Sequence, residues 1–472
     1  MLQSMIRARS IAIVGASQTK NAAGGDKLGT VAMNYLLAHN YPGKVYLVNP
    51  KETEIRGMPC YPDLAAIPDE VDLALIAVPS KASVSVMKEC GTKGVKNAIV
   101  LASGFGEAGE PELEAELLAA AREGGVRFCG PNTNGLISIV NNMVCCTSMV
   151  CAMESFNKGN IAFLTQSGAV GGSMLGIGTE EEGGFSHWIS VGNETDLQVA
   201  DYMDFLVDDP DTKVFALFME GIRDPDKFTQ ALAKAAKVGK PVIIYKIGLS
   251  EVSAAAAASH TGAMVGSDAV FDAVCKKYGV VRVDDASDLL PTAITFSRLL
   301  DKLPRGPRMG LIGPSGGICG VCADECHRFG LDVPALPQEA QDILKQFIPP
   351  FGALRNPVDV TQQIRATPTG YQDTIRTVLE QDCIDGLFLL VTMVGEPRAS
   401  FYTEIFTEAA RATDKPVIVG WTGAPSLAAK AIPQMKKNQV PIYFSARGAV
   451  KAMRALLDYR HFLDARGAED IQ

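Results

Sequence analysis

The chain has 472 residues, of which 47% are hydrophobic and 21% are charged, and its formal net charge is -9. This composition excludes a disordered polypeptide, and the scattered Lys and Arg residues do not form the basic stripe that binding to nucleic-acid phosphates requires. Because no apolar run approaches the roughly 18 residues of a membrane helix, and the first residues lack a secretory signal, we expect a cytoplasmic protein with neither nucleic-acid nor membrane partners.

One pattern, an apolar strand followed by a glycine-containing turn and an amphipathic helix, occurs three times along the chain. The three passages are SIAIVGAS (10–17), NIAFLTQSGAVGGSML (160–175) and MGLIGPSGGICGVCADEC (309–326). After each passage, short continuous apolar strands alternate with helical stretches, which is typical of parallel sheets buried on both faces. We therefore predict three doubly wound, parallel-sheet α/β domains, with boundaries that give residues 1–146, 147–302 and 303–472.

The later strands follow in chain order within each domain. They read VDLALIAVP (71–79), NAIVLASGF (97–105) and VRFCGP (126–131) in the first domain, KVFALFMEG (213–221), PVIIYKIG (241–248) and GVVRVDD (279–285) in the second, and GLFLLVTMVG (386–395), KPVIVGWTG (415–423) and VPIYFS (440–445) in the third. In open parallel sheets, ligands bind beyond the carboxyl ends of such strands, so the turns after these strands are the candidate sites.

The turns of the first domain favour a long ligand that carries a pyrophosphate. The set comprises Gly15, Ala16 and Ser17, whose amides would bind phosphate; Asn49, Pro50 and Val78, which would shape an adenosine pocket; Lys51 as a phosphate cation; and, in the same or neighbouring turns, Lys27, Pro79, Ser103, Gly104, Glu107 and Asn132. The glycine turn is not a full G-x-G-x-x-G fingerprint, so a purely structural turn is equally compatible with it, and Lys51 is also compatible with an ordinary surface lysine.

A cysteine cluster in the third domain superficially suggests a metal site. Cys319, Cys322 and Cys326 are spaced to lie on one helical face, whereas the neighbouring His327 points elsewhere. A tetrahedral site needs four converging ligands. We therefore predict a buried stripe of small residues and no metal.

The ordered series of turns GAS, VNPK, AVP, SGFGE and GPN closely resembles the CoA-binding domain of ADP-forming acyl-CoA synthetases, which are relatives of the succinyl-CoA synthetase α subunit. The resemblance continues through GNIAFLTQSGA, ISVGNETD, LFMEGIRD, SHTGAMVGSD, GLIGPSGG and RNPVDVT, and thus covers essentially the whole chain. It implies a Rossmann-like CoA-binding domain followed by two flavodoxin-like ligase domains. It also implies coenzyme A as the ligand of the first domain.

This sequence departs from the family pattern in three places. Residues 21–26 lengthen the first glycine turn, Thr133-Asn134 follows the GPN turn where Cys-Leu is usual, and Glu194-Thr195 follows Gly192-Asn193. Gly192, Asn193 and Asp196 lie in a strand-end turn of the second domain, where we expect them to border the acyl group. None of the departures removes a chemical group that the reaction needs.

The resemblance implies that His260 accepts a phosphoryl group from an acyl phosphate and later transfers it to ADP. His260 is one of only five histidines and is flanked by Ser259, Thr261 and Gly262, although an exposed loop histidine is the alternative interpretation. The turn Gln166, Ser167, Gly168 and Ala169 at a helix start would supply donors to the phosphate. Glu220 would orient the imidazole, with a helix-capping or solvent-facing carboxylate as its alternative role.

Family members that act alone also carry an ATP-grasp region, and no segment here corresponds to it. We therefore expect ATP or ADP and Mg2+ to bind a separate ATP-grasp β-type subunit, in a hetero-oligomer of the α2β2 type. The substrates would be CoA and a small carboxylic acid. The turn Ser315-Gly316-Gly317 of the third domain is compatible either with phosphate binding or with a docking role.

Two other functions were weighed against the ligase. A non-catalytic CoA-binding or acyl-CoA-binding regulator would keep the fold and the CoA turns without turnover. A nicotinamide dehydrogenase is disfavoured because the full glycine fingerprint and a recognisable catalytic pair are both missing.

Overall fold

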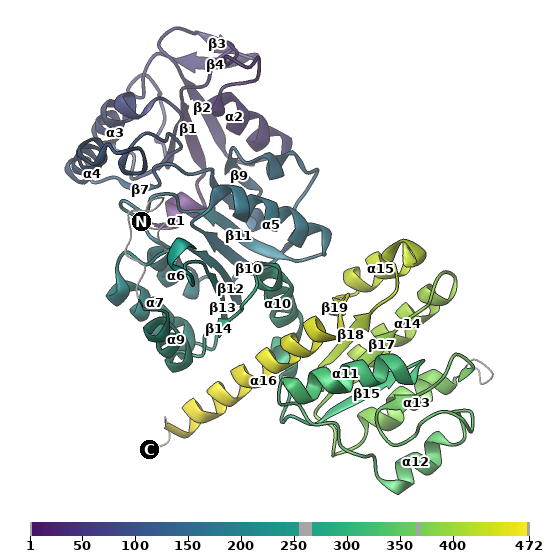
Figure 1. Ribbon diagram of the computed structural model, residues 1–472. Helices are drawn as coiled ribbons and strands as arrows, with labels where there is room; N and C mark the ends of the chain where they lie inside the picture. Colours follow the sequence, from purple (N-terminus) through teal and green to yellow (C-terminus); the bar gives the residue numbers. More distant parts are fainter. Residues whose placement is uncertain (1, 254–266, 365–368, 470–472) are drawn as a thin grey trace. The chain divides into compact units, whose positions relative to one another are not determined.

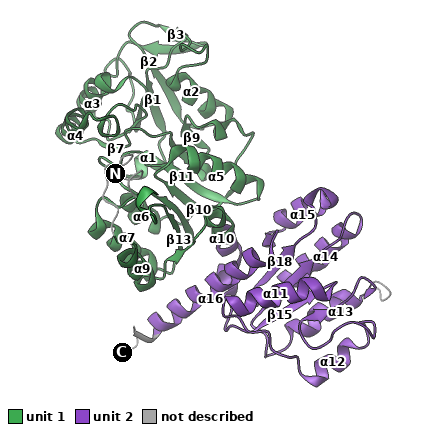
Figure 2. Ribbon diagram, viewed as in Figure 1, with its two compact units in different colours: residues 1–293 green, residues 294–472 purple. Residues whose placement is uncertain are grey.

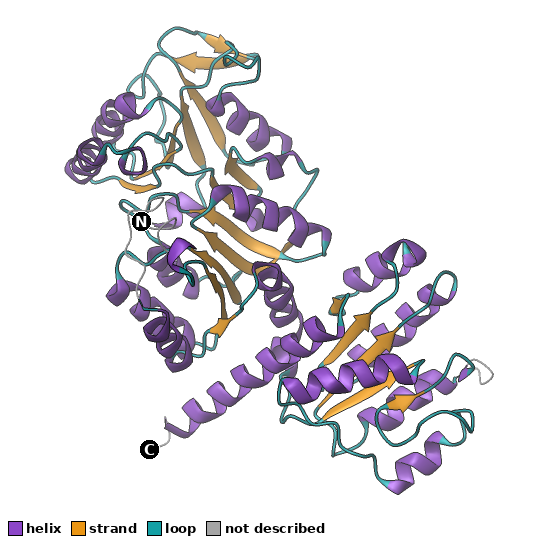
Figure 3. Cartoon of the chain, viewed as in Figure 1, coloured by secondary structure: helices purple, strands orange, loops and turns teal. Residues whose placement is uncertain are grey.

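The computed structural model describes residues 2–253, 267–364 and 369–469, which fold into two compact units, residues 1–293 and 294–472 (Figure 2). Unit 1 contains two seven-stranded sheets and unit 2 contains one five-stranded sheet. Helices cover the sheets (Figure 3). The predicted α/β class with three mostly parallel sheets is confirmed, while the three domain boundaries stay a prediction.

The first sheet has the strand order β3-β4-β2-β1-β5-β6-β7, and all neighbours are parallel except β3 and β4 (Figure 1). Its elements in chain order are α1 (Leu2–Ile6), β1 (Ser10–Val14), α2 (Leu28–Ala38), β2 (Lys44–Val48), β3 (Glu54–Ile55), β4 (Met58–Tyr61), β5 (Leu73–Ile76), α3 (Ser80–Lys93), β6 (Asn97–Val100), η1 (Gly106–Ala108), α4 (Pro111–Gly124) and β7 (Arg127–Cys129).

Strand β1 shows why these apolar runs form central strands. All five of its residues are buried. Ile11 and Ile13 belong to the hydrophobic cluster that includes residues of α1 and α2, whereas Ala12 and Val14 belong to the cluster that includes residues of α3 and α4. Successive side chains of a strand point to opposite faces, so a strand covered by helices on both faces must be continuously apolar.

The second sheet has the strand order β14-β13-β12-β10-β11-β8-β9. Its elements are β8 (Gly135–Ser138), η2 (Ile139–Asn141), β9 (Met143–Cys146), η3 (Met149–Ala152), β10 (Lys158–Thr165), α5 (Gly168–Glu180), β11 (Phe185–Ser190), α6 (Val199–Val207), β12 (Val214–Met219), α7 (Pro225–Lys237), β13 (Val242–Lys246), α9 (Asp268–Lys277), β14 (Val281–Arg282) and α10 (Ala286–Leu299). The hairpin of β8 and β9, which belongs to the predicted first domain, joins this sheet through an antiparallel pairing of β8 with β11.

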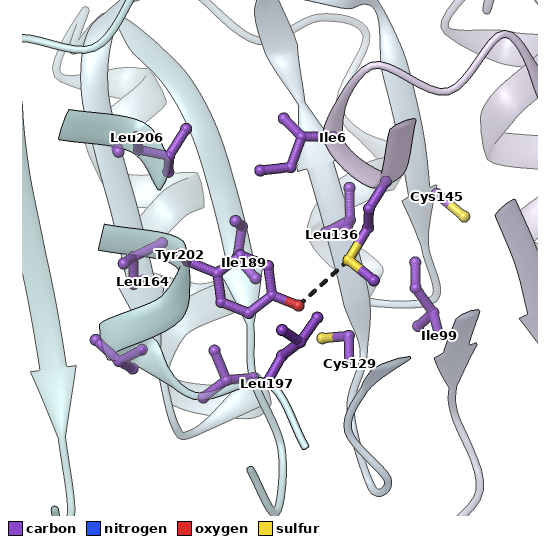
Figure 4. Packing of buried hydrophobic residues seen from close by; sticks show 14 of the residues in the cluster. Ile6, Ile99, Cys129, Leu136, Cys145, Leu164, Ile189, Leu197, Tyr202 and Leu206 are labelled. Carbon is purple, nitrogen blue, oxygen red and sulfur yellow. Dashed lines mark hydrogen bonds between the residues drawn. The ribbon is translucent and has the colours of Figure 1, made fainter. Parts of the chain in front are cut away.

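The two sheets of unit 1 share one hydrophobic core. A single cluster joins Ile6 of α1, Ile99 of β6, Leu164 of β10 and Tyr202 of α6 (Figure 4). The hydroxyl of Tyr202 lies 3.4 Å from the sulfur of Met5. The two sheets of unit 1 therefore pack as one continuous body, which fixes the turns of the first sheet relative to those of the second.

Unit 2 holds a parallel sheet with the strand order β16-β15-β17-β18-β19. Its elements are η4 (Leu300–Lys302), β15 (Met309–Gly313), α11 (Gly316–Arg328), α12 (Gln338–Leu344), β16 (Val358–Asp359), α13 (Gly370–Leu379), β17 (Gly386–Val391), α14 (Arg398–Arg411), β18 (Val417–Trp421), η6 (Pro425–Ala428), α15 (Ala431–Lys437), β19 (Ile442–Tyr443) and α16 (Ala446–Glu469).

The cysteines of α11 lie as the spacing predicted. Cys319, Cys322 and Cys326 are buried, while His327 is exposed. Within the described ranges, no group of three or more His, Cys, Asp or Glu side chains is arranged to hold a metal ion. None of the helices in those ranges is both long and apolar enough to cross a lipid bilayer.

Candidate functional site

The turn after β1 requires glycine at its first position. Gly15 has φ +102°, and a Cβ atom there would lie 2.6 Å from the carbonyl oxygen of Ala77. The turn is therefore held tightly against the end of β5. Ala16 and Ser17, which complete it, are buried.

Two of the three predicted phosphate-binding amides already have acceptors within the protein. The Gly15 amide donates to the carbonyl of Val48 at 3.0 Å, and the Ser17 amide donates to the hydroxyl of Thr30 at 2.9 Å. In this part of the described chain, the amide of Ala16 is the one of the three left for a phosphate. That all three amides serve the ligand stays a prediction, and it requires that Gly15 and Ser17 share their donors with bound phosphate.

The same turn holds a carboxylate that sequence reasoning missed. Glu52 accepts hydrogen bonds from the Ser17 hydroxyl at 2.6 Å and from the Gln18 amide at 3.0 Å. No local motif marks this contact, which spans 35 positions of the sequence for Ser17. Bound phosphate would compete with Glu52 for these donors, since both are anions.

The remaining residues of the predicted CoA set lie around this turn. The Asn49 side-chain amide donates to the carbonyl of Ala16 at 2.8 Å, so Asn49 supports the turn. Val78 is half-buried. The exposed members are Pro50 and Lys51 after β2, Lys27 just before α2, Pro79 just before α3, and Ser103 after β6.

The lengthened segment 21–26 is held by Asp26. This carboxylate pairs with Lys20 at 2.5 Å and with Arg56 at 2.8 Å. The hydrogen bond from Lys20, with the hydrogen bond and charge of Arg56, lowers the pKa of Asp26. Two cations beside the CoA turn are therefore neutralised within the protein, whereas Lys27 and Lys51 are exposed.

Predicted residues of the two sheets meet where Asn193 packs against the first sheet. The Asn193 side-chain amide donates to Glu107 at 2.5 Å and to Glu114 at 3.2 Å, and its oxygen accepts from the amide of Asn132 at 3.2 Å. Glu107 also accepts from the backbone amide of Gly104 at 2.6 Å. The predicted acyl-site turn is thus bound directly to the predicted CoA turns.

Two carboxylates clamp this junction. Burial tends to raise the pKa of Glu107, but the hydrogen bonds from Asn193, Gly104 and Phe105 outweigh it and hold that pKa below its ordinary value. Glu114, which sequence reasoning missed, is buried and also accepts a hydrogen bond from the hydroxyl of Thr195 at 2.6 Å. Glu107 therefore stays ionised at neutral pH and keeps its acceptors turned toward Asn193.

The turn after β10 presents the N-terminus of α5. Ser167 is the N-cap, and its hydroxyl accepts from the amide of Val170 at 3.4 Å. The first amides of a helix have no partner within the helix, so the amides of Gly168 and Ala169 are available to an anion. Ser167 and Gly168 are half-buried and Ala169 is exposed.

The side chain of Gln166 is engaged within the protein rather than held ready for phosphate. It donates to Glu194 at 2.5 Å and to the carbonyl of Gly221 at 2.9 Å. It also accepts from the backbone amide of Glu220 at 2.5 Å. Glu220 follows β12 directly and is 5% exposed. His260 lies outside the described residues.

A cavity of about 290 Å3 joins three of the predicted groups. It is lined by Asn132 from the CoA set, by Gln166–Ala169 from the phosphate turn, and by Gly192 and Asn193 from the acyl turn. The carboxyl ends of β7, β10 and β11 position these residues, as the strand-end argument predicted. The cavity also includes Thr133 and Asn134, which depart from the family pattern.

The corresponding turn of unit 2 faces a carboxylate instead. The Ser315 hydroxyl accepts from the Gly317 amide at 3.3 Å, and a Cβ at Gly316 would lie 3.4 Å from a carboxylate oxygen of Asp359. The negative charge of this carboxylate already offsets the positive end of the helix dipole. We assign no phosphate chemistry to this turn.

Three family models match successive parts of the chain: a CoA binding domain over residues 9–138, a succinyl-CoA ligase like flavodoxin domain over 158–296, and a ligase-CoA domain over 309–468. The chain is 35% identical over 467 residues to the α subunit of acetate–CoA ligase [ADP-forming] II of Pyrococcus furiosus, with 97% of each chain covered. The chain belongs to the ADP-forming acyl-CoA synthetase family. The α subunit of acetate–CoA ligase [ADP-forming] I of the same organism is 35% identical, with 96% of this chain and 97% of that one covered.

A solved structure extends the match within the ADP-forming acyl-CoA synthetase family. It is the dinucleotide-forming acetyl-coenzyme A synthetase 1 of Ca. Korarchaeum cryptofilum, in complex with phosphate and ADP. The TM-score is 0.89 at 32% identity, and 99% of both chains is covered. The fold of this chain is therefore that of the synthetase family along nearly its whole length.

Gly192 gives a test of how rigidly this synthetase holds its acyl turn. Gly192 has φ +62°, and a Cβ there would lie 2.2 Å from the carbonyl oxygen of Pro131, a backbone atom that cannot move aside. We expect Gly192→Ala to lower the free energy of unfolding by about 2 kcal/mol or more, measured by denaturant titration. Gly57→Ala is the control, because Gly57 has φ +80° but nothing within 4 Å. Equal losses of unfolding free energy in both variants would mean that the positive φ, and not the contact with Pro131, causes the effect.

Proposed function

We propose that this chain is the α-type subunit of an enzyme that joins a small carboxylic acid to CoA while ATP is converted to ADP and phosphate. The observation that carries the proposal is the cavity in which the CoA turn at Asn132, the helix N-terminus at Ser167–Ala169 and the acyl turn at Gly192–Asn193 meet. A thiol, an acyl group and a phosphate must all come together in such a reaction. The α subunits of ADP-forming acetate–CoA ligases that resemble this chain over 97% of its length support the same activity.

The proposed chemistry has three balanced steps. His260 takes the γ-phosphoryl group of ATP and releases ADP. A carboxylate oxygen of the acid attacks that phosphorus, which forms an acyl phosphate and frees the imidazole. The CoA thiol loses its proton and attacks the acyl carbon, and phosphate leaves. Every step is reversible.

The protein would contribute positioning and charge neutralisation to these steps. The amides at the start of α5 would bind the transferred phosphoryl oxygens, and Glu220 would orient the imidazole of His260 and stabilise its positive charge. Glu107 and Glu114 hold the side chain of Asn193, which would lie beside bound CoA. A thiol and an acyl phosphate held at reacting distance gain most of their acceleration from this proximity.

We further propose that ATP and Mg2+ bind a separate ATP-grasp β-type subunit, in an assembly of the α2β2 type in the cytoplasm. The two Pyrococcus furiosus relatives that match this chain along almost their whole length are named as α subunits. A phosphohistidine would carry the phosphoryl group between the site on this chain and the nucleotide site on the partner.

The test is a reconstitution. The chain is mixed with its ATP-grasp partner, CoA, ATP, Mg2+ and a panel of carboxylic acids, and acyl-CoA, ADP and phosphate are quantified. We expect the three products in equal amounts, and none when either protein is omitted. A chain that binds CoA in calorimetry but yields no product with any acid would instead support a non-catalytic CoA-binding regulator.

A further inference from the structure

A buried carboxylate outside the cavity lining engages the phosphate turn. Glu194 lies in the turn between β11 and α6 and is 5% exposed. One of its oxygens accepts from the backbone amide of Val199 at 2.7 Å, and the other accepts from the side-chain amide of Gln166 at 2.5 Å. Glu194 does not line the cavity, so we expect it to act on the reaction through these two partners.

The side chain of Gln166 also binds the backbone that follows β12. Its side-chain oxygen accepts from the amides of Glu220 at 2.5 Å and Gly221 at 3.0 Å, while its nitrogen donates to the carbonyl of Gly221 at 2.9 Å. A side-chain amide has distinct donor and acceptor ends, so these bonds fix its orientation. The ionised carboxylate of Glu194 can only accept hydrogen bonds, so it favours the same orientation.

The hydrogen bonds of Gln166 to Glu194 and to the backbone of Glu220 and Gly221, here called the strut, connect the ends of three adjacent strands. Gln166 follows β10, Glu194 lies in the turn after β11, and Glu220 follows β12; these strands are neighbours in the order β12-β10-β11 (Figure 1). Gln166 also directly precedes Ser167, the N-cap of α5. The strut therefore fixes the backbone of Glu220 relative to the helix N-terminus that borders the cavity.

We propose that Glu194 is a positioning residue that, through Gln166, holds Glu220 beside the N-terminus of α5 and so sets the rate of phosphoryl transfer. This inference rests on the function proposed above, in which Glu220 orients His260. Misplacing a reacting group by about 1 Å costs on the order of a hundredfold in rate. Losing the strut therefore slows phosphoryl transfer while the CoA turns keep their own contacts.

The cost of keeping this carboxylate buried argues that it does more than stabilise the fold. Glu194 has φ +55°, a conformation that side chains other than glycine seldom adopt. Burial raises its pKa to about 7, against the hydrogen bonds from Val199 and Gln166 and the charge of Arg223, and Asp201 adds to the increase. A neutral side-chain amide would avoid the burial of a charge, but its single oxygen could not accept from both Gln166 and Val199.

The test uses the full chain with its ATP-grasp partner and γ-labelled ATP. Glu194→Gln replaces one carboxylate oxygen by an NH2 group with almost no change in size, so the side chain can no longer accept from both Gln166 and the Val199 amide. We expect the single-turnover rate of chain labelling to fall about 10- to 100-fold, while KM for CoA stays within about twofold. Glu180→Gln, an exposed position at the end of α5, is the matched control and should keep the wild-type rate.

A second variant guards against a merely structural effect. The double change Glu194→Gln with Gln166→Glu exchanges the donor and the acceptor and restores one bond between the two positions. It should label at least about threefold faster than Glu194→Gln alone, although it loses the bond to the carbonyl of Gly221. Glu194→Asp, which retains the charge, serves if Glu194→Gln fails to fold, and should slow labelling with KM for CoA unchanged.

The outcomes separate this inference from the proposed function. If wild-type chain takes up no label, the proposed function fails. If wild type labels and Glu194→Gln labels equally fast, or if KM for CoA rises in step with the loss of rate, the positioning role is wrong while the proposed function stands. A double variant no faster than Glu194→Gln also overturns it.

Discussion

His260→Ala should abolish the acid-labile, base-stable label that the wild-type chain acquires from γ-labelled ATP and the ATP-grasp partner. Phosphohistidine is labile in acid and stable in base, unlike a phosphoserine or an acyl phosphate. Because the proposed route passes through this imidazole, acyl-CoA formation should fall more than about a thousandfold. The measurement is label per chain after gel separation, alongside product formation.

The matched control for this prediction is His327→Ala. His327 is exposed at the end of α11, so the same side-chain change is made at a histidine with no proposed role. We expect full labelling and full turnover in this variant. Label that persists in His260→Ala would mean that another residue is the nucleophile. Loss of label in both variants would instead indicate damage to the assembly.

The central strands were predictable because helices cover both faces of each sheet. A continuously apolar run such as SIAIV has few alternatives, and the turn after it must lie at the carboxyl edge. This reasoning placed Asn132, Ser167 and Gly192 at strand ends without any knowledge of side-chain contacts. The structure brings these three residues to one cavity.

The pairing of residues 135–146 was not predictable in the same way. Strands β8 and β9 are short and wholly buried. Their apolar character does not indicate which sheet they join or in which direction. The choice is made by β11, which pairs with β8 through Leu136, Ile137 and Ser138. Such long-range pairing leaves no local pattern in the sequence.

The polar contacts of the site were also beyond sequence reasoning. The bond between Asn193 and Glu107 spans 86 positions, and that between Gln166 and the amide of Glu220 spans 54. Gln166 was predicted as a phosphate ligand from its place in the turn, but its side chain is already committed to other partners. Glu194 stood out in the sequence only as a departure from the family pattern, and its burial gives that departure a physical meaning.

We expect the largest loss of stability when a buried ionic cluster in unit 1 is disrupted. Asp209 accepts hydrogen bonds from Arg7 at 2.6 Å, from the Thr212 hydroxyl at 2.9 Å, and lies 3.2 Å from the ring of His187. The other ring nitrogen of His187 lies 3.1 Å from the hydroxyl of Ser138. The cluster therefore ties the segment after α1 to β11 and β8, the strands beneath the cavity.

Asp209→Ala should lower the free energy of unfolding by about 3 to 5 kcal/mol, because it leaves the buried His187 without its carboxylate partner. Arg7 keeps its second anion, Asp211, at 2.8 Å. Denaturant titration of the full chain measures this loss. Asp208→Ala is the control: its side chain is 71% exposed and pairs with Lys234, so the expected loss is below about 1 kcal/mol. Similar losses in the two variants would show that the buried cluster adds nothing beyond a surface pair.

The same cluster should make the protein sensitive to acid. Burial alone would raise the pKa of Asp209, but the hydrogen bonds from His187, Thr212 and Arg7 and the charge of His187 lower it well below its ordinary value. A carboxyl whose folded pKa is depressed contributes its stability above the unfolded pKa of about 3.9 and loses it as the pH falls toward the folded pKa. We expect the difference in stability between wild type and Asp209→Ala to be constant from about pH 7 to pH 5 and to shrink below about pH 4. A difference that persists unchanged down to pH 3 would mean that the ionised carboxylate is not its source.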